Sequence, residues 1–340
     1  MRRKGRIWCI LCLVIMCSYS TIACQKEKSE NAKLAEASQE DVLKIYDEGD
    51  KELQKESALQ GLEEVPSKYK CEEVKVDEIK QPGGVLCLDK DTIIVTDQKT
   101  DCIYKIDPSG KIIKKAGGTG SEQGKFLSPA ALVSYNGEIY VLDQKNNRVQ
   151  ILDWDLNYSR EIKLKNKKSE DPEYLPMSIA VNKNGLYVSA LSIGSAVVDR
   201  YHDDDVEEVG RNFLGSLYSY QDKVYLINAM VRYYDKENDS LGAMSGGPEW
   251  LLKIEKNKMK KIVDLPLGFF ITSFVMSEDQ IICVSTSAAS IFVLDADGRY
   301  KETIGNISGL ENEESPQIAV NENQEYYIAM PTIGKIVCCH

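Results

Sequence analysis

Short apolar runs separated by polar turns dominate the chain from about residue 70 onward. The runs TIIVTD, ending at Asp97, and EIYVLD, ending at Asp143, are rich in β-branched and aromatic residues and are bounded by turns of Gly, Asn and Asp. Runs of this kind between such turns predict β-strands. Related runs end at Ala190, Asn228, Ser285 and Met330.

The strand runs repeat at a nearly constant period. Equivalent positions in the six runs lie 46, 47, 38, 57 and 45 residues apart. Each unit holds about four strands, which in the second unit are AALVSY, EIYVLD, RVQILD and SREIKL. Repeats of this length with four strands each are typical of a β-propeller. The sequence therefore predicts an all-β, six-bladed β-propeller over residues 66–340, whose first strands line a central channel.

The two ends of the propeller region predict how the ring closes. The sixth unit offers only three strands, PQIAV, EYYIA and KIVCC, whereas an unused strand, EEVKVDEI at residues 72–79, precedes the first unit. We expect this strand to form the outer strand of the sixth blade. Antiparallel pairing would bring Cys71 close to Cys338 or Cys339, where a Cys71–Cys339 disulfide would lock the ring; the alternative is free, buried cysteines.

Residues 95–129 resemble an NHL repeat. They contain an Asp after the second strand, the motif D-P-x-G, a glycine-rich link from Gly117 to Gly124, and then Phe126 and Pro129. The stretch DQKNNRVQILD at residues 143–153 repeats the middle portion with the Asn-Arg pair typical of the family. The resemblance covers residues 92–163, and the later units lack these motifs.

The NHL resemblance implies a binding platform more often than an enzyme. It also implies that Asp97, Asp143 and Arg148 organise the turn between the second and third strands, where an Asp side chain accepts backbone N–H bonds. Arg148 is retained as a candidate ligand-binding residue because this turn is expected to open on the same face as the links between blades.

The N-terminus has the features of an export signal. Arg2, Arg3, Lys4 and Arg6 precede a short apolar stretch, and Thr21-Ile22-Ala23-Cys24 resembles a bacterial lipobox with Cys24 as the lipidated residue. The alternatives are an ordinary cleavable signal peptide and a retained membrane anchor. We expect a signal peptide at residues 1–24, a tether and short helices at residues 25–65, and an extracytoplasmic, membrane-anchored lipoprotein of the bacterial cell envelope.

The net charge of the chain makes some classes of binding partner unfavourable. The formal net charge is −11, and loss of the leader with its four basic residues would change it to −15. An acidic domain is a poor candidate for binding nucleic acid or an anionic membrane surface. We therefore expect no nucleic-acid partner, and membrane attachment through the lipid anchor alone.

Candidate metal ligands are sparse. The chain has only two histidines, His202 in an acidic turn and His340 at the C-terminus. Lactonase-type propellers hold a channel metal, and the polar residues that end the inner strands include Asp89, Asn182 and Asn321. Asp and Asn are also common in tight turns. We expect no cofactor and no catalytic residue, and if a metal binds, these three residues are its candidate ligands.

The fourth unit contains an extended segment, AMVRYYDKENDSLGAMSGGPEW at residues 229–250. Long loops on a rigid scaffold are where binding residues concentrate. We predict a ligand-binding loop there, with further contacts from the blade-to-blade links. The candidate residues are Arg232, Tyr233, Tyr234 and Trp250, with Tyr174 and Phe270 from the links.

The leading hypothesis is a non-catalytic recognition platform that binds a protein, peptide or glycan at the cell envelope. Two alternatives remain open from the sequence. One is a metal-dependent hydrolase or lyase of the lactonase-like propeller type. The other is a structural subunit of an envelope complex.

Overall fold

The structure is a computed structural model. It describes residues 66–340 except 166–173, 193–194, 204, 236–239, 246–248, 256 and 266–268. The predicted signal peptide with Cys24, and the tether and helices predicted at residues 25–65, lie outside the described residues. No helix in the described part of the chain is long and apolar enough to cross a membrane.

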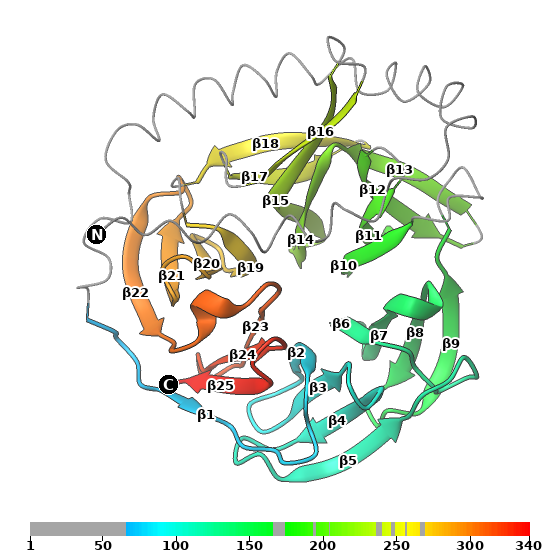
Figure 1. The fold of residues 1–340 in the computed structure, drawn as a ribbon, viewed down its shortest axis with the longest axis vertical. Helices are drawn as coiled ribbons and strands as arrows, with labels where there is room; N and C mark the ends of the chain where they lie inside the picture. The colour runs from blue at the N-terminus through cyan, green and yellow to red at the C-terminus, as the bar shows by residue number, and fades with distance from the viewer. Residues whose placement is uncertain are drawn as a thin grey trace.

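Six antiparallel sheets are arranged around a central axis as the blades of a propeller, which confirms the predicted six-bladed, all-β fold (Figure 1). Blade 1 contains β2 (Pro82–Cys87), β3 (Ile93–Asp97), β4 (Cys102–Ile106) and β5 (Ile112–Gly117). Blade 2 contains β6 (Pro129–Tyr135), β7 (Glu138–Asp143), β8 (Arg148–Asp153) and β9 (Tyr158–Lys163). Blade 3 contains β10 (Leu175–Asn182), β11 (Gly185–Ser192), β12 (Ser195–His202) and β13 (Asp205–Arg211).

The remaining blades follow in chain order. Blade 4 contains β14 (Phe213–Tyr220), β15 (Lys223–Asp235), β16 (Ser240–Ser245), β17 (Trp250–Glu255) and β18 (Lys258–Asp264). Blade 5 contains β19 (Ile271–Met276), β20 (Gln280–Ser285), β21 (Ser290–Asp295) and β22 (Tyr300–Asn306). Blade 6 contains β23 (Gln317–Val320), β24 (Tyr326–Met330), β25 (Lys335–Cys339) and β1 (Cys71–Glu73). Two short 3-10 helices, η3 (Gln144–Asn146) and η4 (Leu310–Asn312), lie in the connections.

The burial of each strand follows its place in the blade. The second strands, such as β3 and β20, are buried along almost their whole length because neighbouring blades cover both of their faces. The outer strands, such as β9, alternate between partly buried and exposed residues. The core is therefore divided into clusters between adjacent blades rather than gathered in one central layer.

Blade 6 combines both ends of the described chain, as the sequence predicts. The sheet order is β1-β25-β24-β23, and Cys71 lies opposite Cys339 in the register. These two cysteines form a disulfide, whereas Cys338 is free and buried. The outer strand is shorter than the expected 72–79, since only Cys71–Glu73 pair as a strand and Val74 adds one further bond to the Ile336 carbonyl.

The segment at residues 229–250 differs from the prediction. Instead of a loop it begins as a strand, because β15 continues to Asp235 and β16 pairs back on it from Met230 to Asp235. The run of β-branched and aromatic residues in MVRYYD favours an extended strand. The outcome is a hairpin that extends blade 4 outward past β17 and β18 (Figure 1).

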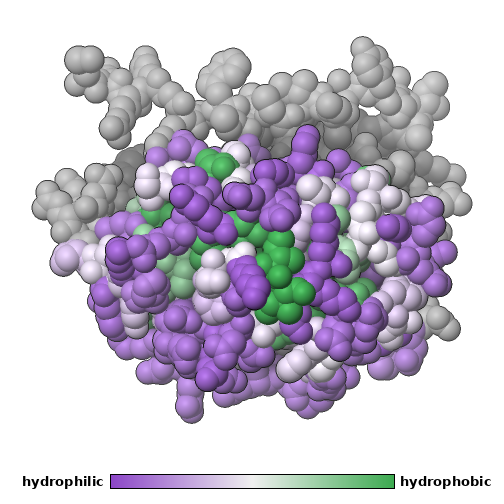
Figure 2. Space-filling view, turned by 90° about the horizontal axis from the view of Figure 1, so that it is seen from below, coloured by the Kyte–Doolittle hydropathy of each residue, from purple (hydrophilic) through white to green (hydrophobic). Residues whose placement is uncertain are grey.

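The outer surface of the ring is mainly hydrophilic. Figure 2 shows the side that lies at the bottom of Figure 1, where β1, β4 and β5 are found, with a small hydrophobic area near its centre. Four large apolar side chains are substantially exposed in the described residues: Ile113, Trp154, Ile262 and Phe270.

Candidate functional site

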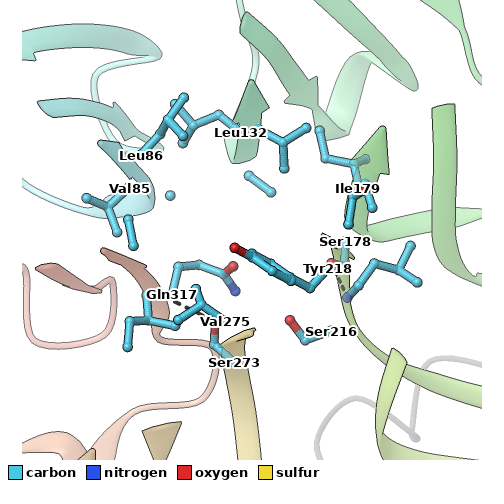
Figure 3. A pocket seen from close by; sticks show the side chains of 18 of the residues that line it. Val85, Leu86, Leu132, Ser178, Ile179, Ser216, Tyr218, Ser273, Val275 and Gln317 are labelled. Carbon is cyan, nitrogen blue, oxygen red and sulfur yellow. Dashed lines mark hydrogen bonds between the residues drawn. The ribbon is translucent and has the colours of Figure 1, made fainter. Parts of the chain in front are cut away.

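The six inner strands enclose a cavity along the axis of the propeller (Figure 3). Its volume is about 260 Å³, and every blade contributes lining residues from its first strand. Five of these strands contain a β-bulge or register shift near their start, and β23 does not. Bulges change the direction of side chains next to binding sites, so they influence which groups face the channel.

Polar side chains are concentrated on blades 3 to 6 of the lining, although apolar residues such as Val275 lie there too and the hydroxyl of Ser134 lies on blade 2. Val85 and Leu86 of blade 1 and Leu132 of blade 2 present aliphatic groups (Figure 3). Blades 4 to 6 present hydroxyl, phenol and amide groups, and blade 3 contributes both Ile179 and a hydroxyl. The polar lining residues labelled in Figure 3 are Ser178, Ser216, Tyr218, Ser273 and Gln317.

Two of the channel hydroxyls join neighbouring blades. Ser178 Oγ accepts a hydrogen bond from the Leu217 N–H at 3.0 Å, across the boundary between blades 3 and 4. Ser273 Oγ accepts one from the Ile318 N–H at 3.2 Å, across the boundary between blades 5 and 6. Both serines are almost fully buried. These bonds hold the polar side of the channel in a fixed arrangement.

Tyr218 places an aromatic ring within the channel (Figure 3). Its ring packs against Phe274 with centroids 5.8 Å apart. Burial raises the pKa of the Tyr218 phenol, and the Met276 backbone partly opposes that rise. The phenol therefore stays neutral at physiological pH and acts as a hydrogen-bonding group rather than as a charge.

These polar channel residues were missed by sequence reasoning, although a signal for them exists. In each blade, one inner-strand residue lies opposite the second-strand residue that comes just before the last residue of the apolar run. These six inner-strand residues are Gly84, Ala131, Ser178, Ser216, Ser273 and Gln317. Aligning the first strands by this register would have revealed the change from small, non-polar residues to hydroxyl and amide residues around the ring.

The candidate metal ligands form turns at the ends of inner strands. Asp89 Oδ1 accepts the Asp91 N–H, and Asn182 Oδ1 accepts the Asn184 N–H. The Asn182 and Asn321 amides also donate to the Asp222 and Lys90 carbonyls of the next blades. All three side chains thus have a structural use, and among the described residues no group of three or more His, Cys, Asp or Glu is placed to hold a metal ion.

The two histidines contact residues outside the channel lining. His202 is exposed, and its Nε2 is 3.2 Å from Asp203 Oδ2. His340 Nε2 is 3.8 Å from Glu72 Oε2, and its other ring nitrogen lies 3.9 Å from Cys338 Sγ. Neither ring is a lining residue of the central cavity.

Arg148 is buried, and all of its donors bond to blade 2 or to the link that precedes it. Its Nε donates to Asp143 Oδ2 at 2.8 Å, and one terminal nitrogen donates to Glu161. The other bonds go to the carbonyls of the glycine-rich link, namely Ser121, Glu122 and Lys125. Since all five N–H donors of a guanidinium are used, Arg148 joins a turn to a link and has no donor left for a ligand.

Asp143 and Asp97 connect the same two kinds of loop. Asp143 accepts the Leu127 N–H of the link, and Asp97 accepts the Lys80 and Gln81 N–H groups before blade 1. Asp97 also accepts the N–H of Lys99 within its turn, as expected. Connections between second and third strands therefore lie on the same face as the blade-to-blade links, which we call the link face.

Two other candidate ligand-binding residues are buried. Trp250 is 2% exposed and packs on Phe213 with ring centroids 5.6 Å apart, so its indole is a core side chain and offers no stacking surface. Tyr174 is also buried, with its hydroxyl 3.0 Å from the Tyr201 hydroxyl, and burial raises its pKa well above the usual range. The sequence pattern does not reveal this burial, because both residues lie next to connecting segments.

Phe270 and the hairpin residues are placed differently. Phe270 is 40% exposed, has a positive φ of 49°, and lies on the link before blade 5. Arg232, Tyr233 and Tyr234 belong to β15 and pair with Ala243, Gly242 and Leu241 of β16. The side chains of these three residues lie outside what the structure describes.

Solved structures with the same fold have low sequence identity to this chain. Virginiamycin B lyase from Staphylococcus aureus matches with a TM-score of 0.53 and 16% identity, covering 80% of this chain and 99% of that one. A protein of unknown function from Bacteroides thetaiotaomicron gives 0.55 and 12%, covering 80% and 72%. A putative gluconolactonase gives 0.56 and 8%, covering 81% and 93%. No protein-family model and no curated protein matches the sequence. At these identities the likeness shows the fold alone, and that fold is the six-bladed β-propeller.

Proposed function

We propose that this protein is a non-catalytic recognition platform of the bacterial cell envelope, which binds a protein, peptide or glycan partner. In this proposal the propeller is of the NHL type, Cys24 attaches it to the membrane through lipid, and residues 25–65 form the tether. The binding surface is the link face around blade 4.

The observation that best supports this role is the β15–β16 hairpin. It adds a two-stranded extension to blade 4, which no other blade has among the described residues. Phe270 on the following link leaves an apolar ring partly exposed to solvent. A rigid scaffold that carries one projecting element is a common arrangement for recognition. Arg232, Tyr233 and Tyr234 on the hairpin have the residue types that are enriched in binding hot spots.

The chemistry of the channel agrees with binding better than with catalysis. The lining residues carry hydroxyl, phenol, thiol, amide and apolar groups, and none is a histidine, carboxylate, lysine or arginine. General acid–base catalysis needs a group whose pKa lies near the working pH. Burial raises the pKa of the Tyr218 phenol, and it raises the pKa of the Cys87 thiol to about 12, so neither group meets that requirement.

The test is a binding comparison with the mature, lipid-free protein on a glycan array and against solubilised envelope proteins. Arg232→Ala, Tyr234→Ala and Phe270→Ala are each expected to weaken binding by about tenfold or more, as hot-spot truncations do. Arg299→Ala is the matched control, because this arginine lies in an exposed turn between β21 and β22. Equal binding by all four variants would remove the hairpin and Phe270 from the proposal.

A second candidate is a metal-dependent hydrolase or lyase. The observation that favours it is that similar folds include proteins named as a lyase and a putative gluconolactonase. In that case Asp89, Asn182 and Asn321 would supply oxygen ligands. Metal analysis of protein purified without chelator distinguishes the two: a stoichiometric divalent ion lost in Asp89→Ala would support the enzyme.

A third candidate is a structural subunit of an envelope complex. The exposed side chains of Ile113 on blade 1 and Trp154 on the neighbouring blade 2 favour it, since apolar groups gathered on a surface often mark a contact with a partner. Stable co-purification with one envelope protein, lost on Ile113→Ser and Trp154→Ser substitution, would support this role.

A further inference from the structure

The central channel has an asymmetry that the recognition role at the link face does not use. At one level of the ring the residues are Gly84 and Ala131 on blades 1 and 2, and hydroxyl or amide residues on blades 3 to 6. Aliphatic side chains of Leu86, Leu132 and Ile179 line the same cavity (Figure 3). At this level a molecule in the channel would therefore meet a polar wall formed by blades 3 to 6 and no polar side chain from blades 1 and 2.

The side chains of the polar wall can form further hydrogen bonds. The Ser178 and Ser273 hydroxyls each accept a backbone N–H, and a serine hydroxyl can also donate one bond. Within the described residues neither hydroxyl donates to a protein acceptor, and the side chains of Ser216 and Gln317 have no protein partner. The Ser216 and Gln317 side chains are only partly buried, so water reaches them, and a ligand with hydroxyl groups can take the place of that water.

The lining also restricts the charge of a ligand. No Asp, Glu, Lys or Arg lines the cavity, so an ionised group would lose its water without gaining a counter-charge. The ligand should therefore be uncharged. It should have oxygen atoms along one edge that accept hydrogen bonds from the serine hydroxyls. It should also have hydroxyl groups that donate hydrogen bonds to the side-chain carbonyl of Gln317.

The size of the cavity points to a single ring. A cavity of about 150 Å³ accommodates benzene, whereas drug-sized ligands occupy roughly 300 to 1,000 Å³. At about 260 Å³ the channel has room for one ring with polar substituents. A sugar ring has polar edges and an apolar C–H face, and the aromatic ring of Tyr218 offers that face a partner (Figure 3).

We propose that the channel binds one uncharged sugar ring, with its hydroxyls against Ser178, Ser216, Ser273 and Gln317 and its C–H groups against the Tyr218 ring and the aliphatic side chains of blades 1 and 2. This inference rests on the proposed recognition function and names a glycan as its ligand. The channel holds the terminal sugar, and the link face contacts the rest of the partner.

The test uses the full mature protein and free monosaccharides as probes. Glucose, galactose, mannose and N-acetylglucosamine are titrated by calorimetry and by ligand-observed NMR, with galacturonate as the charged probe and phenol as the aromatic one. At least one neutral sugar is expected to bind, and galacturonate and phenol are expected to bind at least about tenfold more weakly than that sugar, corresponding to about 1.4 kcal/mol.

Variants locate the site. Gln317→Ala and Ser216→Val are each expected to weaken the sugar by about fivefold, as loss of one neutral hydrogen bond does. Gln123→Ala, which truncates an exposed glutamine on the link, is the matched control and should bind like the wild type. Ser134→Trp blocks the channel from an exposed lining position and should abolish binding while the thermal unfolding temperature stays close to that of the wild type.

Several results would overturn the proposal. They are the absence of binding by every neutral sugar to folded protein, equal or tighter binding of phenol or galacturonate, and sugar binding that survives Ser134→Trp. If Ser216→Val or Gln317→Ala fails to fold, the Ser134→Trp result decides. Failure here leaves the hairpin test untouched, because that test measures binding to intact envelope partners rather than to monosaccharides.

Discussion

Glu249 shows how a single buried side chain can make the stability of this protein depend on pH. The residue is 6% exposed, and its Oε1 accepts the Ile271 N–H at 2.6 Å, which joins blade 4 to the first residue of β19 in blade 5. Burial raises the pKa of this carboxyl from 4.5 to about 8, although the backbone N–H groups of Ile271 and Phe270 partly oppose the rise. Burial thus disfavours the ionised form more strongly than the hydrogen bonds favour it.

The sign of the resulting pH effect follows from proton linkage. The folded protein holds the Glu249 proton more tightly than the unfolded chain, so this contribution to stability is complete below about pH 4.5. It is lost as the pH rises towards about 8, with a slope of at most about 1.4 kcal/mol per pH unit. Glu249→Gln is therefore expected to be more stable than the wild type at pH 8 and to lose this slope.

Urea unfolding at several pH values checks the Glu249 prediction. Glu322→Gln is the control, because it makes the same change in an exposed turn after β23. A Glu249→Gln protein whose unfolding free energy keeps the wild-type dependence between pH 5 and pH 8 would contradict the assignment.

At the scale of elements, the blades are held together through their connections as much as through their strands. Asp143 and Arg148 bond to the link that precedes blade 2, and Asp97 bonds to the segment that precedes blade 1. The later units replace these residues by others, such as Glu313, which accepts the Thr332 and Ile333 N–H groups. One physical task, pairing buried backbone N–H groups, is therefore performed by different side chains.

Arg148→Lys tests this role of the connections. Lysine has three donors on a flexible stem and cannot reproduce five bonds in a planar arrangement. We expect a loss of about 2 to 4 kcal/mol in the free energy of unfolding, since the Asp143 carboxylate and the link carbonyls would remain buried with too few partners. Chemical denaturation followed by fluorescence measures this loss.

The matched control for Arg148 is Arg160→Lys. Arg160 lies on the outer strand β9, forms an ion pair with Glu138 and is half exposed. Its replacement should therefore lower the free energy of unfolding by less than about 1 kcal/mol. Similar losses in the two variants would mean that Arg148 is not a special connection between turn and link.

For the whole molecule, the decisive feature is the closure of the ring. The Cys71–Cys339 disulfide joins positions 268 residues apart and fastens the outer strand of blade 6 to the C-terminal strand. Gly305 on blade 5 leaves room for it, because a Cβ there would lie 2.2 Å from Cys71 Sγ. Only a ring that mixes both ends of the chain can bring these sulfur atoms together.

Removal of the disulfide should weaken the entire propeller. A Cys71→Ser, Cys339→Ser double variant is expected to lose about 2 to 5 kcal/mol of stability, because its unfolded chain gains freedom. Cys87→Ser is the control, since Cys87 is a free thiol. Thermal unfolding with and without reductant provides the measurement; reductant should lower the midpoint of the wild type and of Cys87→Ser but leave the double variant unchanged. A double variant as stable as the wild type would show that strand pairing alone closes the ring.

The sequence by itself determined the repeat, the number of blades and the way in which blade 6 is completed. These features follow from the spacing of apolar runs and from a strand left over at one end, and both are local patterns along the chain. The structural role of Asp97, Asp143 and Arg148 in the turns could also be predicted, because their motif has a fixed position relative to the strands.

Only the tertiary structure decided which side chains are exposed to a ligand and which are buried. Trp250 and Tyr174 are buried because neighbouring elements cover them, and the segment after Asn228 pairs with itself as a hairpin. The channel lining depends on bulges and on six strands that are far apart in sequence. Burial and convergence arise from contacts between distant residues, and a local pattern of polar and apolar positions does not contain them.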